Sequence, residues 1–301
     1  MKNTILATML ALATTAASAQ VTVYGRLSEF VDSTKTGTTT VKSLVNDSSR
    51  IGIRAEEKLG TGLTARLVVE TSVAADDPKT GTSTQLGDRQ STVGLASRFG
   101  SVDLGRKEHS EYITMKNADP FGGGNYATIN SDINNDRSKR IGDGAFVATN
   151  VGPVNVSYDR SMYTNPAIAE ATSWSLGGKI GPVTTAVARF ASGADHTNVV
   201  TLSAQVAGLT LSTIQSEDKT GAVETKGQLY GVIAPLNNTV SVKGSYGIKT
   251  GLAAGDVKAY NLGVAYAFSK RTNVSVAYRN VDAGGTANDV KQIGLGLSHN
   301  F

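Results

Sequence analysis

The sequence of 301 residues contains no cysteine and only 6 prolines. The absence of cysteine excludes disulfide bonds, so the fold must be held together by packing and by backbone hydrogen bonds. No low-complexity tract, heptad pattern or helical repeat interrupts the chain, and no boundary suggests a second domain. These absences indicate one large domain.

A long hydrophobic run is also missing beyond the start of the chain. Residues 1–19 predict a cleaved signal peptide, which would leave 20–301 as the mature domain. They begin with a positive charge at Lys2, continue with an apolar run over 5–13 and end in the small residues 17–19. No later stretch reaches the ~18 apolar residues of a membrane-spanning helix. The mean hydropathy of −0.13 suits a soluble protein, but it also suits a transmembrane β-barrel, because only every second strand residue faces lipid.

Neither sign of charge is in large excess. Lysine and arginine number 29, aspartate and glutamate number 25, and the formal charge of +4 falls to +3 once Lys2 is removed. An excess this mild does not predict binding to nucleic acid.

Histidine is rare, with three residues, and none of them belongs to a cluster with metal-ligand spacing. His109 lies near two glutamates, but no spacing places a serine nucleophile and an acid around it, so an enzyme is disfavoured. Residues 122–124 are glycines without the Lys-Ser/Thr of a phosphate-binding loop. The acids and asparagines of 130–136 suit weak Ca²⁺ binding, although a solvated loop explains them better. We therefore expect no catalytic residue, no metal and no cofactor.

What the sequence has in abundance is a two-residue alternation of apolar and polar side chains. It is clearest near the end of the chain, where Ile293, Leu295 and Leu297 fall on one face, with glycine, glutamine and serine on the other. The same period recurs over 239–248 and 257–268. A period of two predicts β-strands rather than helices.

The connectors between the alternating segments differ in length in a regular way. Seven short connectors interleave with eight long polar ones, and the segments between them number sixteen. Short turns on one side and long loops on the other predict an all-β fold, an antiparallel transmembrane β-barrel of sixteen strands. The expected long connectors are residues 32–47, 73–87, 107–136, 161–172, 193–196, 218–223, 249–256 and 282–288.

A soluble β-sandwich would alternate in the same way. In lipid, however, each unpaired backbone group costs several kcal/mol, so a spanning sheet has to close. Aromatic residues at the ends of the apolar faces favour the membrane, because they are typical of girdles at the two interfaces. The expected girdle residues are Tyr24, Phe30, Tyr246, Tyr260, Phe268, Tyr278 and Phe301.

Residues 107–136 form the longest stretch without a strand or helix period. A loop of this length is uncommon in a compact domain unless it has a function. In a closed barrel it can fold inward and narrow the lumen, and a mobile surface loop is the alternative. We expect the first, with this segment forming the constriction of a channel.

Several segments share the patterns of one protein family. They are 20–26 (QVTVYGR), 48–52 (SSRIG), 57–63 (EKLGTGL), 89–95 (RQSTVGL), 99–106 (FGSVDLGR), 119–122 (DPFG) and the final Phe301. In these segments the chain resembles the trimeric general porins of Gram-negative bacteria, in particular the β-proteobacterial branch. It departs from the family pattern after Arg137, so Arg137 and Arg140 both remain candidates for the family's loop arginine.

The resemblance implies an outer-membrane channel that passes small hydrophilic solutes and ions by passive diffusion. It further implies a homotrimer, contacts with outer-membrane lipid and lipopolysaccharide, and insertion by the barrel-assembly machinery, with Phe301 as the assembly signal. An outer-membrane barrel that acts mainly as an adhesin or receptor, with a closed lumen, is the alternative function.

Strand parity predicts which charges line the channel. Ile51 and Ile53 mark the lipid face of their strand, so Arg50 and Arg54 face the lumen, since a charge facing lipid near the midplane would cost ~2–4 kcal/mol. The resemblance implies that Arg89 and Arg137 also face the lumen at the constriction. The expected basic wall consists of Arg50, Arg54, Arg89, Arg137 and Arg140, and the expected loop acids opposite it are Glu108, Asp119 and Asp132. Charges at the narrowest point dominate the field, so we expect the channel to prefer anions.

Overall fold

The computed structural model describes residues 20–74, 85–123, 125–134, 138–162, 170–285 and 288–301, so that the expected signal peptide over 1–19 and Arg137 lie outside it. The described part contains seventeen strands and two helices. The first strands are β1 (Gln20–Thr36), β2 (Thr39–Asn46), β3 (Arg50–Gly60), β4 (Leu63–Ser72), β5 (Gln90–Ser97), β6 (Gly100–Glu108), β7 (Arg140–Val151), β8 (Val154–Ser161) and β9 (Ala171–Ile180). The others are β10 (Val183–Ser192), β11 (Asp195–Val206), β12 (Leu209–Thr220), β13 (Val223–Pro235), β14 (Val240–Thr250), β15 (Val257–Ala267), β16 (Thr272–Asp282) and β17 (Val290–Asn300), and the helices are α2 (Ser110–Ala118) and α3 (Asn130–Ile133).

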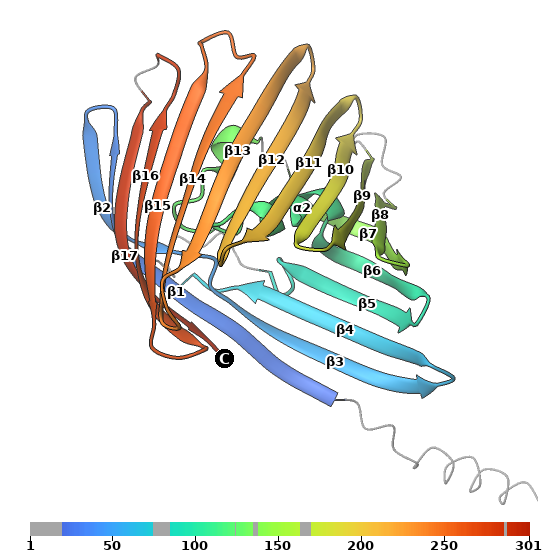
Figure 1. Cartoon of the computed structure of the whole chain (residues 1–301). Coiled ribbons are helices and arrows are strands. Elements are labelled where there is room, and N and C mark those ends of the chain that lie inside the picture. The colour runs from blue at the N-terminus through green and yellow to red at the C-terminus, as the bar shows by residue number, and fades with distance from the viewer. Residues whose placement is uncertain (1–19, 75–84, 124, 135–137, 163–169, 286–287) are drawn as a thin grey trace, which may run out of the picture.

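The strands form one closed antiparallel barrel (Figure 1). Each strand from β3 onward pairs with the next, and β17 pairs with β1 over 26–36, which closes the ring. The strands β2 and β3 pair with the same edge of β1, over 29–36 and 20–26 respectively. They therefore share one place around the barrel, and the seventeen segments fill sixteen places. The predicted all-β barrel of sixteen strands is confirmed.

The prediction of a long loop over 32–47 is wrong. The strand β1 continues to Thr36, and after the two-residue turn 37–38 the chain returns as β2. The interruption lies at 47–49, where the pairing with β1 shifts by one residue and Ser48 has a positive φ of 58°. The sequence predicted a loop here because most of the segment is polar, but it is rich in threonine and valine, which are enriched in strands.

Apolar side chains face outward along the barrel, as the alternation predicted. In β17, for example, Leu295 and Leu297 are more than half exposed, while Ser298 between the outward positions is buried. Tyr230, Tyr246 and Tyr260 lie in register on three neighbouring strands of the same outer face. This arrangement is typical of an aromatic girdle at a membrane interface.

Two expected girdle residues face the lumen instead. Phe30 is only 4% exposed and stacks on Tyr126 of the inward loop, with ring centroids 3.9 Å apart. Tyr24 lies below the guanidinium of Arg54, 5.1 Å from the ring centroid. In β1 the even-numbered positions point inward, whereas Val21, Val23 and Val31 point outward. Both aromatic residues occupy even-numbered positions and therefore face the lumen.

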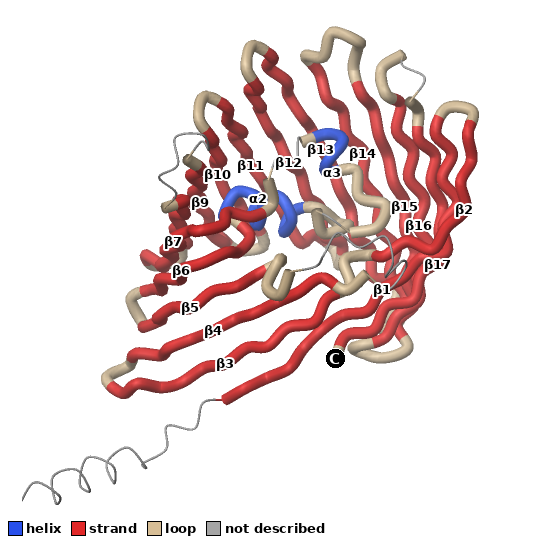
Figure 2. The backbone as a smooth tube through the Cα atoms, turned by 180° about the vertical axis from the view of Figure 1, so that it is seen from behind, coloured by secondary structure: helices blue, strands red, loops and turns tan. Residues whose placement is uncertain are grey.

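The inward loop lies within the barrel (Figure 2), and the hydrophobic core lies between this loop and the wall. Met115, Ile129 and Ile133 of the loop pack against Ile214 and Leu229, and all five side chains are at most 1% exposed. Neither helix of the described residues has the length and apolar character needed to cross a membrane. The helices instead belong to the predicted inward-folded loop, which is confirmed and which the apolar contacts hold against one side of the barrel.

Glycines on the inner wall make room for the loop. A Cβ atom at Gly231 would lie 2.4 Å from Cγ of Pro120, and one at Gly247 would lie 2.6 Å from Cγ1 of Ile133. Real Cβ atoms do not approach other atoms this closely, so a larger residue at either position must displace the loop from the wall. The sequence contained this signal, since both glycines occupy inward positions of alternating strands.

We expect Gly231→Val to lower single-channel conductance, because the added side chain pushes Pro120 toward the passage. Overpacking of this kind typically costs ~1–3 kcal/mol, so the barrel should still fold. Gly244→Val is the matched control, because Gly244 pairs with the outward-facing Leu262 on the neighbouring strand. Equal conductance in the two variants would contradict this account of the inner glycines.

The last residue completes the seam between β17 and β1. Phe301 and Gly25 exchange two backbone hydrogen bonds of 3.1 Å, and the Phe301 ring fills the space beside Gly25 on the outer surface. We expect deletion of Phe301 to lower the amount of folded, heat-modifiable protein in the outer membrane sharply, with export across the inner membrane intact. Phe301→Tyr keeps the ring and should assemble normally, whereas normal assembly of the deletion variant would refute the prediction.

Candidate pore constriction

The segment between β6 and β7 crosses the interior of the barrel (Figures 1 and 2). It packs α2 against the inner faces of β8 to β12 and α3 against those of β13 to β15. Both helices therefore lie along one side of the barrel. The passage runs between this side and the opposite wall, which consists of β3 to β6.

The start of α2 is attached to the wall by its backbone. The N–H groups of Ser110 and Glu111 donate to Asp159 of β8 and Ser173 of β9, at 2.6 and 2.9 Å. Burial lowers the pKa of His109 to about 4, so its ring is neutral at pH 7 and its Nδ1 accepts a hydrogen bond from the N–H of Tyr112 at 3.3 Å. The N–H groups of the first helical turn, which have no partner within the helix, thus all receive acceptors at fixed positions.

The expected loop acid Asp119 lies inside the loop. Its carboxylate is buried and accepts hydrogen bonds from the N–H groups of Phe121 and Gly123, at 3.0 and 2.8 Å, and from the Thr128 hydroxyl at 2.6 Å. The carboxylate fixes the tight turn after α2 and offers no free charge to the passage. Its burial follows from the turn geometry, which the spacing of residues did not reveal.

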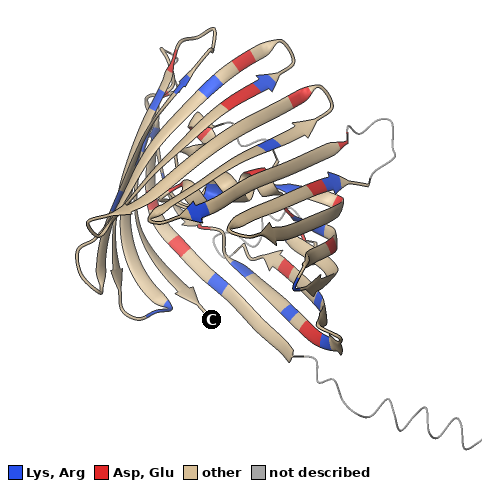
Figure 3. Cartoon of the chain, turned by 45° about the vertical axis from the view of Figure 1, so that its right-hand side comes forward, with Lys and Arg blue, Asp and Glu red and all other residues tan. Residues whose placement is uncertain are grey.

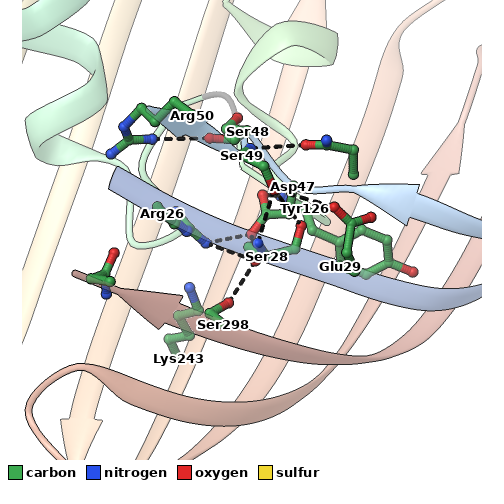
Figure 4. Close-up of polar contacts among 12 residues, drawn as sticks. Arg26, Ser28, Glu29, Asp47, Ser48, Ser49, Arg50, Tyr126, Lys243 and Ser298 are labelled. Atoms are coloured by element: carbon green, nitrogen blue, oxygen red, sulfur yellow. Dashed lines mark hydrogen bonds and ion pairs between the residues drawn. The ribbon is translucent and has the colours of Figure 1, made fainter. Parts of the chain in front are cut away.

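The tip of the loop is attached to the first strands (Figure 4). The N–H of Tyr126 donates to Asp47 at 2.6 Å, and its hydroxyl donates to Asp32. Its ring stacks on Phe30. The interruption between β2 and β3 therefore has a function in the fold, because it turns Asp47 toward the lumen to receive the loop.

The expected loop acid Asp132 faces a different wall. Both of its carboxylate oxygens lie 2.6 Å from Nη2 of Arg279, which belongs to β16. Asp132 is therefore neutralised on the side of the barrel where α3 packs, away from β3 to β6.

Arginines on or next to the strands β1 to β5 pair with carboxylates of the same region. Glu70 of β4 joins two of them, with Nε of Arg50 at 3.5 Å and Nε of Arg89 at 2.8 Å. Arg26 of β1 pairs with Asp47 at 2.5 Å. The charges of Arg26 and Arg89 also lie within electrostatic reach of Arg50, so the three form one group.

Glu108 extends this group to the base of the loop. It pairs with Arg140 of β7 at 3.2 Å and with Lys116 of α2 at 2.7 Å, and Arg89 lies within electrostatic reach of Arg140. We call this set the arginine row, and it consists of the cations Arg26, Arg50, Arg89, Arg140 and Lys116 and the carboxylates Asp47, Glu70 and Glu108. Five cations and three carboxylates leave an excess of two positive charges beside the passage.

Three of the predicted wall residues thus meet: Arg50, Arg89 and Arg140. Arg54 also faces the lumen, but it lies four residues farther along β3, or about 13 Å at the rise of a strand. The sequence reasoning missed Arg26 and Glu70, although inward parity marks both. The interleaving of the two signs on the same strands is visible in Figure 3.

The described residues hold no group of three or more histidine, cysteine, aspartate or glutamate side chains that could bind a metal ion. The arginine row provides no nucleophile paired with a base. What it can do is attract small anions, because positive charges in a narrow, low-dielectric passage focus the field.

Residues 6–301 match the model of the family described as Gram-negative porin. The chain belongs to this family. As a member of it, the protein lies in the outer membrane, and the outward apolar belt meets lipid. The resemblance to Gram-negative porins is confirmed.

Individual relatives of this porin are moderately similar. An outer membrane porin of Bordetella pertussis is 26% identical over 85% of this chain and 83% of its own length. Major outer membrane protein P.IB of Neisseria meningitidis is 35% identical over 35% of this chain, and the match spans about a third of that protein (34%). The anion-selective porin of Comamonas acidovorans has the same fold, with a TM-score of 0.78 and 22% identity over 94% of this chain and all of its own.

Proposed function

We propose that this porin is a water-filled channel for passive diffusion of small hydrophilic solutes, and that it prefers anions. The observation that carries the proposal is the arginine row, with its excess of two positive charges beside the inward loop. The fold shared with an anion-selective porin supports the same preference. No chemical step is needed, because concentration gradients drive the solutes.

Single-channel conductance in planar bilayers tests the channel itself. We expect discrete, long-lived conductance steps for the purified protein in KCl. An adhesin or receptor with a closed lumen would bind its partner without conducting, so the absence of steps from correctly folded protein would overturn the proposal.

We further propose a homotrimer whose outer faces contact outer-membrane lipid and lipopolysaccharide after insertion by the barrel-assembly machinery. The exposed apolar residues of β1 and β3, such as Val21, Val23 and Ile53, support the assembly, because they can pack on a second copy as well as on lipid. Unboiled samples on a denaturing gel should run at about three times the mass of boiled ones. A single band at the monomer position in both samples would exclude a stable trimer.

A further inference from the structure

A cavity beside the loop tip joins one further cation, Lys243, to part of the arginine row. The cavity has a volume of about 430 Å³ and is bounded by Phe121 and Tyr126 of the loop and by the inner faces of β14 to β17 and β1. Its charged lining consists of Arg26, Arg50, Lys243 and Asp47, again an excess of two positive charges. Figure 4 shows Lys243 on the same side of the lumen as Arg26 and Ser298.

Lys243 of β14 is the distinctive member of this lining. Its Nζ donates to the carbonyl oxygen of Pro120 at 3.3 Å and lies 4.1 Å from the centroid of the Phe121 ring. These contacts hold the ammonium group in one place. Lys243 has no carboxylate within 4.0 Å and therefore no ion-pair partner among the residues that the structure describes.

The carboxylates nearest to Lys243 already form hydrogen bonds or ion pairs with other groups. Asp47 binds Arg26, the Ser28 hydroxyl and the N–H of Tyr126, and Asp119 is enclosed by the turn of the loop. An ammonium group has three N–H donors, and the Pro120 carbonyl takes one of them. A partly buried cation without a counter-ion is unfavourable, and a bound anion would supply the missing acceptor.

Hydroxyl groups complete the surroundings. Ser241 shares the inner face of β14 with Lys243, and Ser275 lines the same cavity from β16. Hydroxyl donors beside fixed cations suit the oxygen atoms of an oxyanion better than a halide, because several hydrogen bonds are directed at different atoms.

We propose that this cavity is a binding site for a small dianion with an oxygen surface, held by Lys243, Arg26 and Arg50 with hydroxyl groups from β14 and β16. The proposal rests on the channel function, since the ligand reaches the cavity through the passage. Two positive charges in excess match a dianion. The volume admits either a hydrated inorganic ion or the phosphate group of a larger solute, so the shared chemistry is a doubly charged oxyanion group.

The test is block of the chloride current in a planar bilayer. With KCl on both sides, we expect added sulfate to reduce the current of the wild-type porin in a saturable way. Lys243→Met keeps the packing on Phe121 but removes the charge, and the block should weaken about thirtyfold, which corresponds to losing one unit charge about 4 Å from a dianion in water. Lys243→Arg should retain the block.

Lys249→Met is the matched control. Lys249 lies on the same inner face of the same strand, opposite the inward Gly227, and six residues or about 20 Å from Lys243. The Lys249→Met substitution removes the same charge as Lys243→Met, and the sulfate block should remain as in the wild type. Glycerol phosphate added in place of sulfate identifies the source, because a Lys243-dependent block by only one of the two ligands assigns the site to that ligand.

Two results would overturn the site: no saturable block of the wild type by either ligand, or equal weakening in Lys243→Met and Lys249→Met. The reversal potential in a KCl gradient, recorded on the same channels, tests the general anion preference separately. That preference depends on the arginine row, and it should survive in both methionine variants even if the site does not exist.

Discussion

A porin carrying both Arg50→Glu and Arg89→Glu is expected to prefer cations. The two substitutions change the arginine row from five cations and three carboxylates to three cations and five carboxylates, so its excess charge reverses from two positive to two negative. At ~4 Å a unit charge contributes about 1 kcal/mol in water and ~4 kcal/mol at an effective dielectric of 20. Even the smaller value corresponds to a roughly fivefold change in preference for each charge, and the effect should weaken at high salt.

The single variant Arg50→Glu should have an ion preference between that of the wild type and that of the double variant, with a reversal potential near zero in a KCl gradient. Arg54→Glu is the matched control, since it makes the same change on the same face of the same strand about 13 Å away. Charges in water are largely screened beyond ~8 Å at physiological ionic strength, so its shift should be clearly smaller. Equal shifts at Arg50 and Arg54 would show that the arginine row does not set the field.

Substitution of Asp119 is expected to have the second large effect, which is an increase in pore size. Asp119→Ala leaves the N–H groups of Phe121 and Gly123 and the hydroxyl of Thr128 without their acceptor. Each buried donor without a partner costs ~1–3 kcal/mol, which is enough to release the turn after α2. We expect higher and noisier single-channel conductance and faster entry of oligosaccharides in liposome swelling.

Asp119→Asn separates the structural role of this side chain from its charge. The amide keeps the shape and one acceptor oxygen, so conductance should change less than in Asp119→Ala, and ion preference should stay close to that of the wild type. A strong gain in anion preference with unchanged conductance would mean that the carboxylate reaches the passage, as the sequence had suggested.

The architecture could be predicted because a spanning strand repeats one simple rule. Each strand must present apolar residues to lipid at every second position, so alternation located the strands and parity placed Arg50 and Arg54 on the inner face. The strands within 32–47 were not predicted because the rule does not hold where a strand is polar on both faces. Tyr24 and Phe30 were wrongly placed in the outer girdle because their aromatic character was given more weight than their inward position in the strand alternation.

The site was less predictable, since it depends on contacts between distant segments. Lys243 meets Pro120 across 123 residues of sequence, and Asp132 meets Arg279 across 147. Composition of the loop correctly suggested that carboxylates enter the barrel. It could not reveal that Asp119 is enclosed by its own turn, that Asp132 is neutralised on another wall, or that Glu108 belongs to the arginine row.

The most direct test of the central claim is the reversal potential of the wild-type porin in a planar bilayer with a KCl gradient. If the arginine row sets the field in the passage, the potential has the sign of anion preference at low salt and declines toward zero as the salt concentration rises. A potential of cationic sign would contradict the account, because carboxylates outside the arginine row would then control the passage.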